Sequence, residues 1–257
     1  ASSSEENLCN KDCEVTSLLS HENQAAASIK WKKINFTVPP IPDEILESSQ
    51  NIRPKNNFIT LPNNVNVYFR ETLPKLTNKK GDVLLLHDKI YNSDIWETRT
   101  IMPILAVLGY RVLAINMPGF AHSRGECTPN CLKDMFVLLN VTQPIVVTSE
   151  IQGIAIQRLL SKNPEFIKGL VPVIPNIIHG YPSEGYDAIK TKTLVIVGGL
   201  YEDLLSLSKP GSIFQPFQRM PFGQVLAIPK TWNRPIMYNT ENFATFLVNF
   251  ITRIERE

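Results

Sequence analysis

The stretch "PIVVTSEIQG", residues 144–153, places a hydroxyl and a carboxylate side by side between two different patterns. Its first half is a short apolar run, as in a buried strand, and "IAIQRLLSK" continues as a helix. A sharp turn between such elements lifts its central side chain above the sheet, where a nucleophile can act. That central side chain is Glu150, and Ser149 precedes it. The turn therefore carries either an unusual nucleophile or none.

A hydroxyl nucleophile also needs a base, and histidine is the side chain that most often takes the proton. The chain has four histidines, and none follows His179. Ser149 with His179 is thus one arrangement that would give a weak serine hydrolase or acyltransferase. The alternative interpretation of Ser149 is a turn serine that bonds to the backbone.

Strand and helix patterns alternate from residue 57 onward and must position these groups. A hairpin is expected in "NFITLPNNVNVYFRETLP", and a buried strand follows in "DVLLLHD". Further strands are expected in "YRVLAIN", "PIVVT", "GLVPVIP", "TLVIVG" and "QVLAIP", with an amphipathic helix from about Thr240. This order predicts an α/β fold with a mostly parallel, twisted sheet, an antiparallel N-terminal edge and helices on both faces. Residues 1–56 are polar and rich in turn formers, which predicts an irregular N-terminal extension to a domain over residues 57–257.

Three segments carry a resemblance to a known fold. "LLLHDKIYNSDIW" resembles the oxyanion-loop segment LHGxxxxSxxW of the α/β-hydrolases, and "GYRVLAINMPGFAHS" resembles their GYRVxAxDxPGxGxS. "VVTSEIQG" stands where their nucleophile turn belongs. Within that superfamily, "VYFRETLP", "GLVPVIP" and "YDAIKTKTLVIVG" are similar to the α/β-hydrolase domain-containing 14 family, over residues 60–255. The resemblance implies the α/β-hydrolase fold, a Ser–Asp–His triad, and ester hydrolysis or acyl transfer.

The triad positions depart from the pattern of this family. Glu150 stands at the position of the serine, and Asn233 lies in the loop that should hold the histidine. Simple alignment puts Tyr201 at the position of the acid; a small slip would place Glu202 or Asp203 there, with no histidine to orient. Dehalogenases and epoxide hydrolases attack with an aspartate at the first position, but they also need a histidine to activate water. Loss of triad members typically costs about 10⁴- to 10⁶-fold in rate. These departures from the family pattern therefore predict a scaffold without catalytic activity.

The oxyanion loop departs as well, because His87-Asp88 replaces the usual His-Gly. A carboxylate beside a developing oxyanion repels it, and losing one donor there typically costs about 100- to 1000-fold in rate. We expect His87 to close its strand and to hold the loop through a hydrogen bond. We expect His122 to pack in a loop beside the nucleophile turn.

Glu150 needs a counterpart if it lies in a pocket, since desolvation penalises its charge. Arg234, from the loop after the last strand, is a candidate partner. Such an ion pair would close the old active site. Alternatively, the Glu150 carboxylate would recognise a cationic ligand, and the chain would act as a small-ligand carrier.

Cysteines and sequons bear on the compartment. Two N-x-[ST] sequons give Asn35 and Asn140 as candidate glycosylation sites, and four cysteines form two close pairs, Cys9/Cys13 and Cys127/Cys131. No histidine stands at zinc-ligand spacing beside them, so we expect no metal site, and nothing indicates a cofactor. The cysteines could pair in three ways, or stay as four free thiols in a cytosolic protein.

An even cysteine count with sequons favours a secreted or lumenal location, in the endoplasmic reticulum, the Golgi or outside the cell. The missing initial methionine agrees with a removed signal or an anchor before Ala1.

Charge and hydropathy exclude some partners. A formal charge of +2 does not indicate nucleic-acid binding, and no apolar run reaches the roughly 18 residues that span a bilayer. We therefore expect a catalytically inactive protein that binds another protein, such as a membrane protein, as an accessory subunit. The N-terminal segment, with Trp31, Phe36 and a proline run, is the candidate docking element.

Overall fold

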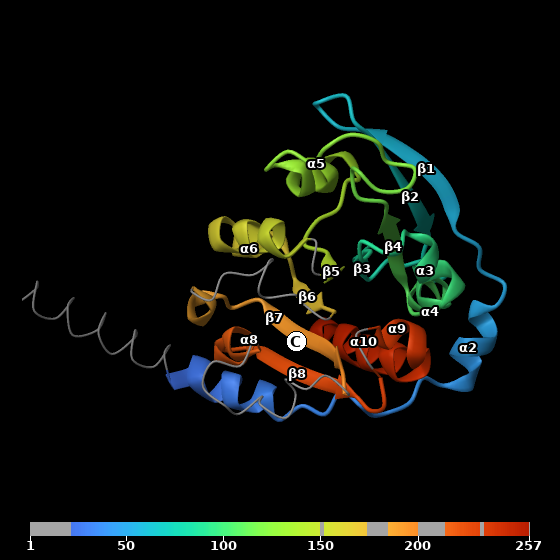
Figure 1. Cartoon of the computed structure of the whole chain (residues 1–257). Coiled ribbons are helices and arrows are strands. Elements are labelled where there is room, and N and C mark those ends of the chain that lie inside the picture. Colours follow the sequence, from blue (N-terminus) through green and yellow to red (C-terminus); the bar gives the residue numbers. More distant parts are fainter. Residues whose placement is uncertain (1–21, 150–151, 174–184, 200–213, 232–233, 257) are drawn as a thin grey trace, which may run out of the picture. The chain divides into compact units, whose positions relative to one another are not determined.

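The structure is a computed structural model that describes residues 22–149, 152–173, 185–199, 214–231 and 234–256 (Figure 1). The chain separates into two compact units, Ala1–Asn35 and Phe36–Glu257. In the described part of the first unit, residues 22–32 form a helix. The second unit contains the sheet and the candidate site. Glu150, Tyr201, Asn233, His179, Cys9 and Cys13 lie outside the described residues, and so the predictions made for them stay predictions.

An eight-stranded sheet forms the centre of the second unit within the described residues, in the order β1-β2-β4-β3-β5-β6-β7-β8. Strand β2 pairs antiparallel with β1 and β4, and the other pairs are parallel. The predicted mixed sheet with an antiparallel N-terminal edge is confirmed. The strands are β1 (Lys55–Thr60), β2 (Asn66–Thr72), β3 (Gly81–Leu86), β4 (Tyr110–Ile115), β5 (Ile145–Thr148), β6 (Gly169–Pro172), β7 (Lys192–Gly198) and β8 (Gly223–Ile228).

Helices cover both faces of this sheet, as expected (Figure 1). One face packs against α5 (Cys131–Leu138), α6 (Gly153–Lys162) and α8 (Gln215–Arg219), which share a core with alternate side chains of β3, such as Leu84 and Leu86. The opposite face packs against α4 (Ile101–Val107) and α10 (Thr240–Glu255). The remaining described helices are α2 (Asp43–Ser49), α3 (Asp94–Thr98), α9 (Pro235–Tyr238) and two short 3₁₀ turns, η2 (Pro164–Phe166) and η3 (Tyr186–Ala188).

The last helix follows directly from its sequence pattern. Asn239 Oδ1 accepts a hydrogen bond from Asn242 N at 3.2 Å and caps the first turn. The apolar residues of α10 recur at three- and four-residue steps, and all of them are buried: Phe243, Phe246, Leu247, Phe250, Ile251 and Ile254. The predicted start at about Thr240 and the apolar face are confirmed.

The N-terminal segment is more ordered than its composition suggests. The expectation of irregular backbone over residues 1–56 is wrong where the chain is described, because residues 22–32 and α2 are helical and β1 begins at Lys55. Asn249 Nδ2 of α10 donates to Phe36 O at 3.0 Å and to Pro39 O at 2.9 Å, and the Phe36 ring lies 5.6 Å from that of Phe250. Burial of the Phe36 side chain thus holds in place a segment whose sequence shows no clear helix or strand pattern.

The docking role predicted for Phe36 is corrected by its burial within the second unit, where it is only 1% exposed and lies against Phe250. The docking role predicted for Trp31 stays a prediction. No helix within the described ranges has the length and apolar character needed to cross a bilayer.

One disulfide is formed among the described cysteines, between Cys127 and Cys131. Its Cα atoms are 5.3 Å apart, within the range that a disulfide requires. Of the connectivities left open by the sequence, the structure therefore contains the local loop through "CTPNC", which ends at the first residue of α5.

Candidate functional site

A pocket of about 200 Å³ opens at the carboxyl ends of the parallel strands. Ligands of α/β proteins bind at this edge because the loops after neighbouring strands converge there. The loop after β3, helix α3, the end of β5, the residue after β6 and the start of α9 all contribute. The lining residues are Leu86 to Tyr91, Ile95, Trp96, Thr148, Ser149, Val173, Arg234, Pro235 and Ile236.

His87 is held at both ring nitrogens. The backbone N–H of Met117 donates to Nε2 at 3.0 Å, so Nε2 carries no proton and Nδ1–H donates to the Asp88 carbonyl at 2.7 Å. Burial lowers the pKa of His87 below its ordinary value of 6.5, against smaller opposing effects of the Asp88 carbonyl and carboxylate. The ring is therefore a neutral support between β3 and the loop after β4, and it has no free nitrogen to act as a base.

Gln152 binds the nucleophile turn to the oxyanion loop. Its Oε1 accepts from Ser149 N at 2.9 Å, and its Nε2 donates to His87 O at 2.8 Å. A backbone donor on one side and a carbonyl on the other fix which end of the amide is oxygen. Thr148 Oγ1 also lies 3.2 Å from Oε1. The buried Gln152 side chain therefore joins the end of β5 to the backbone of the loop after β3.

Ser149 faces this same cluster. Its Oγ lies 2.9 Å from both His87 O and Gln152 Oε1, which are acceptors, and the residue is buried. The hydroxyl hydrogen is thus committed to a carbonyl-type oxygen. Among the described residues no base lies within hydrogen-bond distance of this hydroxyl, and this arrangement agrees with the interpretation of Ser149 as a turn serine.

Three charged residues line the pocket: Asp88, Lys89 and Arg234. Asp88 Oδ1 accepts from Ile90 N at 3.0 Å, an interaction that shapes the turn of the loop after β3. The Arg234 guanidinium lies 5.8 Å from the centre of the Tyr91 ring, and its Nε is buried without a hydrogen-bond partner in the described part of the chain. Arg234 does reach the pocket, as its predicted pairing with Glu150 requires.

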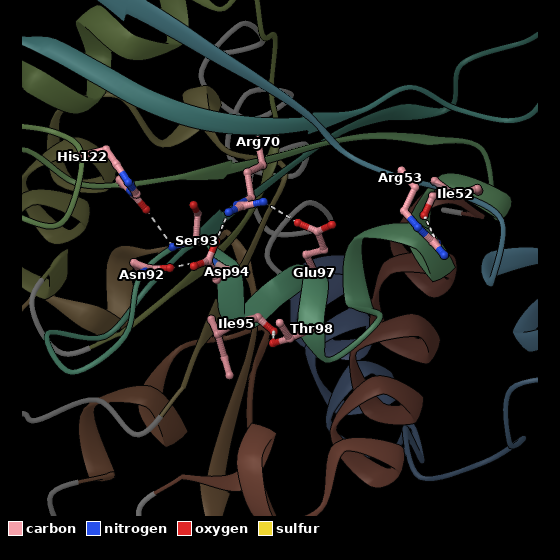
Figure 2. A network of polar contacts seen from close by, with 11 residues as sticks. Ile52, Arg53, Arg70, Asn92, Ser93, Asp94, Ile95, Glu97, Thr98 and His122 are labelled. Atoms are coloured by element: carbon pink, nitrogen blue, oxygen red, sulfur yellow. Dashed lines mark hydrogen bonds and ion pairs between the residues drawn. The ribbon is translucent and has the colours of Figure 1, made fainter.

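The loop after β3 is braced at its far end by an ion-pair cluster (Figure 2). Arg70, on β2, binds the carboxylates of Asp94 and Glu97 in α3. This cluster could not be predicted from local sequence patterns, because Arg70 is 24 residues from Asp94 and 27 residues from Glu97. The side chain of Asn92 accepts from Asp94 N at 2.7 Å at the start of α3, and the hydroxyl of Ser93, the residue before the helix, makes no such bond.

His122 belongs to the same network and not to the pocket lining. Asn116 Oδ1 accepts from Ser93 N at 2.7 Å, and Asn116 Nδ2 lies 3.4 Å from His122 Nδ1. The His122 ring packs 4.9 Å from that of Tyr68. His122 therefore acts in loop packing. No three His, Cys, Asp or Glu side chains gather at metal-binding distance among the residues that the structure covers.

The strand order of the sheet and the helices on both of its faces define the class of protein as the α/β-hydrolase fold. A CIB-like hydrolase from Thermoplasma acidophilum superposes with a TM-score of 0.65 at 16% identity, covering 79% of this chain and 100% of that one. The carboxylesterase CesB of Bacillus subtilis gives a TM-score of 0.62 at 12% identity, covering 89% and 98%.

The chain is more specifically a distant homologue of the ABHD14 proteins. ABHD14A of Mus musculus is 27% identical over 198 residues, which cover 74% of this chain and 78% of the mouse protein. ABHD14B of Homo sapiens, whose name describes protein-lysine deacylation, is 26% identical over 198 residues, covering 74% and 91%. No family model matches the chain.

Proposed function

We propose that this α/β-hydrolase-fold protein binds a partner and does not catalyse hydrolysis. The observation that carries the proposal is the connection from β8 to α9, "PKTWNR", which contains no histidine and brings Arg234 into the pocket. A guanidinium has donors only and keeps its proton, so it cannot serve as the general base of a serine or carboxylate nucleophile.

The surroundings of the turn after β5 support the same proposal. The Ser149 hydroxyl bonds to His87 O and so joins the end of β5 to the loop after β3. The His87 nitrogens are used in bonds to Asp88 O and to Met117 N, which connect that loop to the loop after β4. Buried groups in a network of this kind stabilise one local arrangement. The site thus retains the shape of a hydrolase pocket, and its polar groups serve structure.

A fluorophosphonate probe tests the proposal against the runner-up, a weak serine hydrolase or acyltransferase using Ser149 and His179. The purified chain and its Ser149→Ala variant are exposed to the probe, and labelled peptides are identified by mass spectrometry. We expect no label at residue 149 in either protein. Labelling of Ser149 that disappears in Ser149→Ala and in His179→Ala would replace the proposal with the runner-up.

The partner that we propose is another protein of the secretory pathway or the cell surface, such as a membrane protein. The disulfide Cys127–Cys131 supports an oxidising compartment, since such bonds rarely persist in the cytosol. Cross-linking in intact cells, followed by purification of the chain, should recover a defined lumenal or membrane protein at constant stoichiometry. Recovery of the chain alone from cross-linked cells would contradict this part of the proposal.

A small-ligand carrier is the second candidate, and the pocket itself favours it. Ile95, Trp96 and Ile236 give the pocket an apolar wall, and Arg234 and Asp88 give it charges of both signs. A cationic ligand that raises the melting temperature of the chain, but not that of Glu150→Gln, would support the carrier with Glu150 as its recognition group. Equal stabilisation of both proteins would exclude that role of Glu150.

A further inference from the structure

Helix α5 ends in a turn that explains why an asparagine stands at residue 140. Asn140 has a φ of 49°, its N–H donates to Val137 O at 3.1 Å, and Val141 N donates to Phe136 O at 3.0 Å. These two bonds define a Schellman motif, in which glycine is the usual residue and asparagine the next. The backbone alone makes this cap, so the Asn140 side chain is not needed for it.

The polar side chains of the sequon Asn140-Val141-Thr142 are both accessible. Asn140 and Thr142 are exposed, and neither side chain makes a hydrogen bond within the described structure. Val141 between them is buried in the core together with Phe136. The cap explains an asparagine at residue 140 and does not depend on Thr142. An accessible asparagine with threonine at that spacing is what N-glycosylation requires.

Two apolar side chains lie exposed on the turn that Asn140 ends. Val137 is 69% exposed and Leu138 is 45% exposed. They are two and three residues before Asn140, and the bond from Asn140 N to Val137 O keeps the asparagine within one helical turn of them. A bulky, solvated group on Asn140 would therefore lie beside this apolar pair.

The other end of α5 carries an independent indication of the compartment. The disulfide Cys127–Cys131 ends at the first residue of α5. Disulfides persist mainly in oxidising compartments, so this bond supports the secretory pathway, where oligosaccharides are also attached to asparagine.

We propose that Asn140 carries an N-linked oligosaccharide that covers Val137 and Leu138. The proposal rests on the secretory-pathway part of the proposed function. The donor is a lipid-linked oligosaccharide of the endoplasmic reticulum. Nδ2 of Asn140 forms a bond to C1 of the first sugar, the bond from C1 to the lipid diphosphate breaks, and the amide proton leaves with the diphosphate. The attached sugar then shields the apolar end of α5 from other molecules.

Matched variants separate the glycan from the cap. Asn140→Gly removes the acceptor and keeps the backbone motif, because glycine is favoured at this position. Thr142→Ala removes the sequon and leaves Asn140 in place, whereas Thr142→Ser keeps a sequon, because serine also satisfies the pattern. In the full chain made by cells of its natural source, peptide mapping before and after peptide-N-glycosidase should find residue 140 occupied. Asn140→Gly and Thr142→Ala should lose that glycan, and Thr142→Ser and Asn35→Gln should keep it.

Thiol labelling of the same material distinguishes the ways in which the proposal can fail. An unmodified Asn140 in protein whose Cys127 and Cys131 resist labelling would overturn the glycan and leave the secretory location standing. An unmodified Asn140 with both thiols free would overturn both. Neither outcome bears on the absence of hydrolysis, which the fluorophosphonate probe measures separately.

Sedimentation velocity tests the covering role. We expect the glycosylated chain to stay at one size over a concentration series at which Asn140→Gly self-associates. Adding Val137→Ser to Asn140→Gly should reverse the association, because it removes the more exposed apolar side chain. Identical sedimentation of the glycosylated chain and Asn140→Gly at every concentration would overturn the covering role.

Discussion

Replacing Gln152 by alanine removes the amide that joins the turn after β5 to the loop after β3. Ser149 N then loses its acceptor in a buried position, and an unpaired buried donor costs about 1–3 kcal/mol. His87 O loses one of its two side-chain donors and keeps the Ser149 hydroxyl, at a net cost of about 1 kcal/mol. We therefore predict that Gln152→Ala lowers the free energy of unfolding by about 3 kcal/mol.

Urea unfolding, followed by circular dichroism, measures this change, with two control variants. Gln50→Ala makes the same chemical change on an exposed side chain and should stay within about 0.5 kcal/mol of the unmodified chain. Gln152→Met fills a similar volume without hydrogen bonds, so it should lose nearly as much stability as Gln152→Ala. The reasoning is refuted if Gln152→Ala behaves like Gln50→Ala. It is also refuted if Gln152→Met recovers the lost stability, because packing would then be the cause.

Three other predictions follow from the same structure. The pKa of His87 is lowered from 6.5 in the folded state, so as the pH falls the imidazole is protonated in the unfolded chain before it is protonated in the folded chain. Stability should be complete above about pH 6.5 and fall as the pH drops from there toward the folded-state pKa, and a urea–pH series on His87→Gln should show a smaller fall. Arg70→Met leaves the carboxylates of α3 without their cation and should lower the free energy of unfolding by about 1 kcal/mol; no change in its urea midpoint would contradict the bracing role. Reduction of Cys127–Cys131 reopens a short loop and should lower the unfolding free energy by about 2 kcal/mol, as measured with and without dithiothreitol; equal midpoints would rule out a stabilising bond.

Much of the fold could be predicted because its signals are local. The apolar run that becomes β3 and the three- and four-residue steps of α10 each reflect burial of one element, and periodicity reports that directly. The antiparallel edge followed from a hairpin pattern close to the start of the domain. The helix over residues 22–32 and α2 were missed because their sequences are polar, and only tertiary packing reveals that Phe36 is an anchor.

The candidate site was predicted only in part. The resemblance to α/β-hydrolase motifs placed His87, Asp88 and Ser149 at one edge of the sheet, and Arg234 reaches the same pocket. The role of Gln152 could not be predicted, because its partner is a carbonyl 65 positions away that carries no side-chain signature. A long polar residue where a turn needs a small one was nevertheless a usable signal. A buried residue of this kind needs hydrogen-bond partners for its amide, and so its presence indicates unpaired backbone groups nearby.

Steady-state hydrolysis of p-nitrophenyl acetate tests the central claim most directly. We predict that the purified, folded chain hydrolyses this ester no faster than Ser149→Ala and no faster than the same protein after heat denaturation. Turnover at an ordinary enzymatic rate, lost in Ser149→Ala or His179→Ala, would contradict the claim that this pocket binds without catalysing.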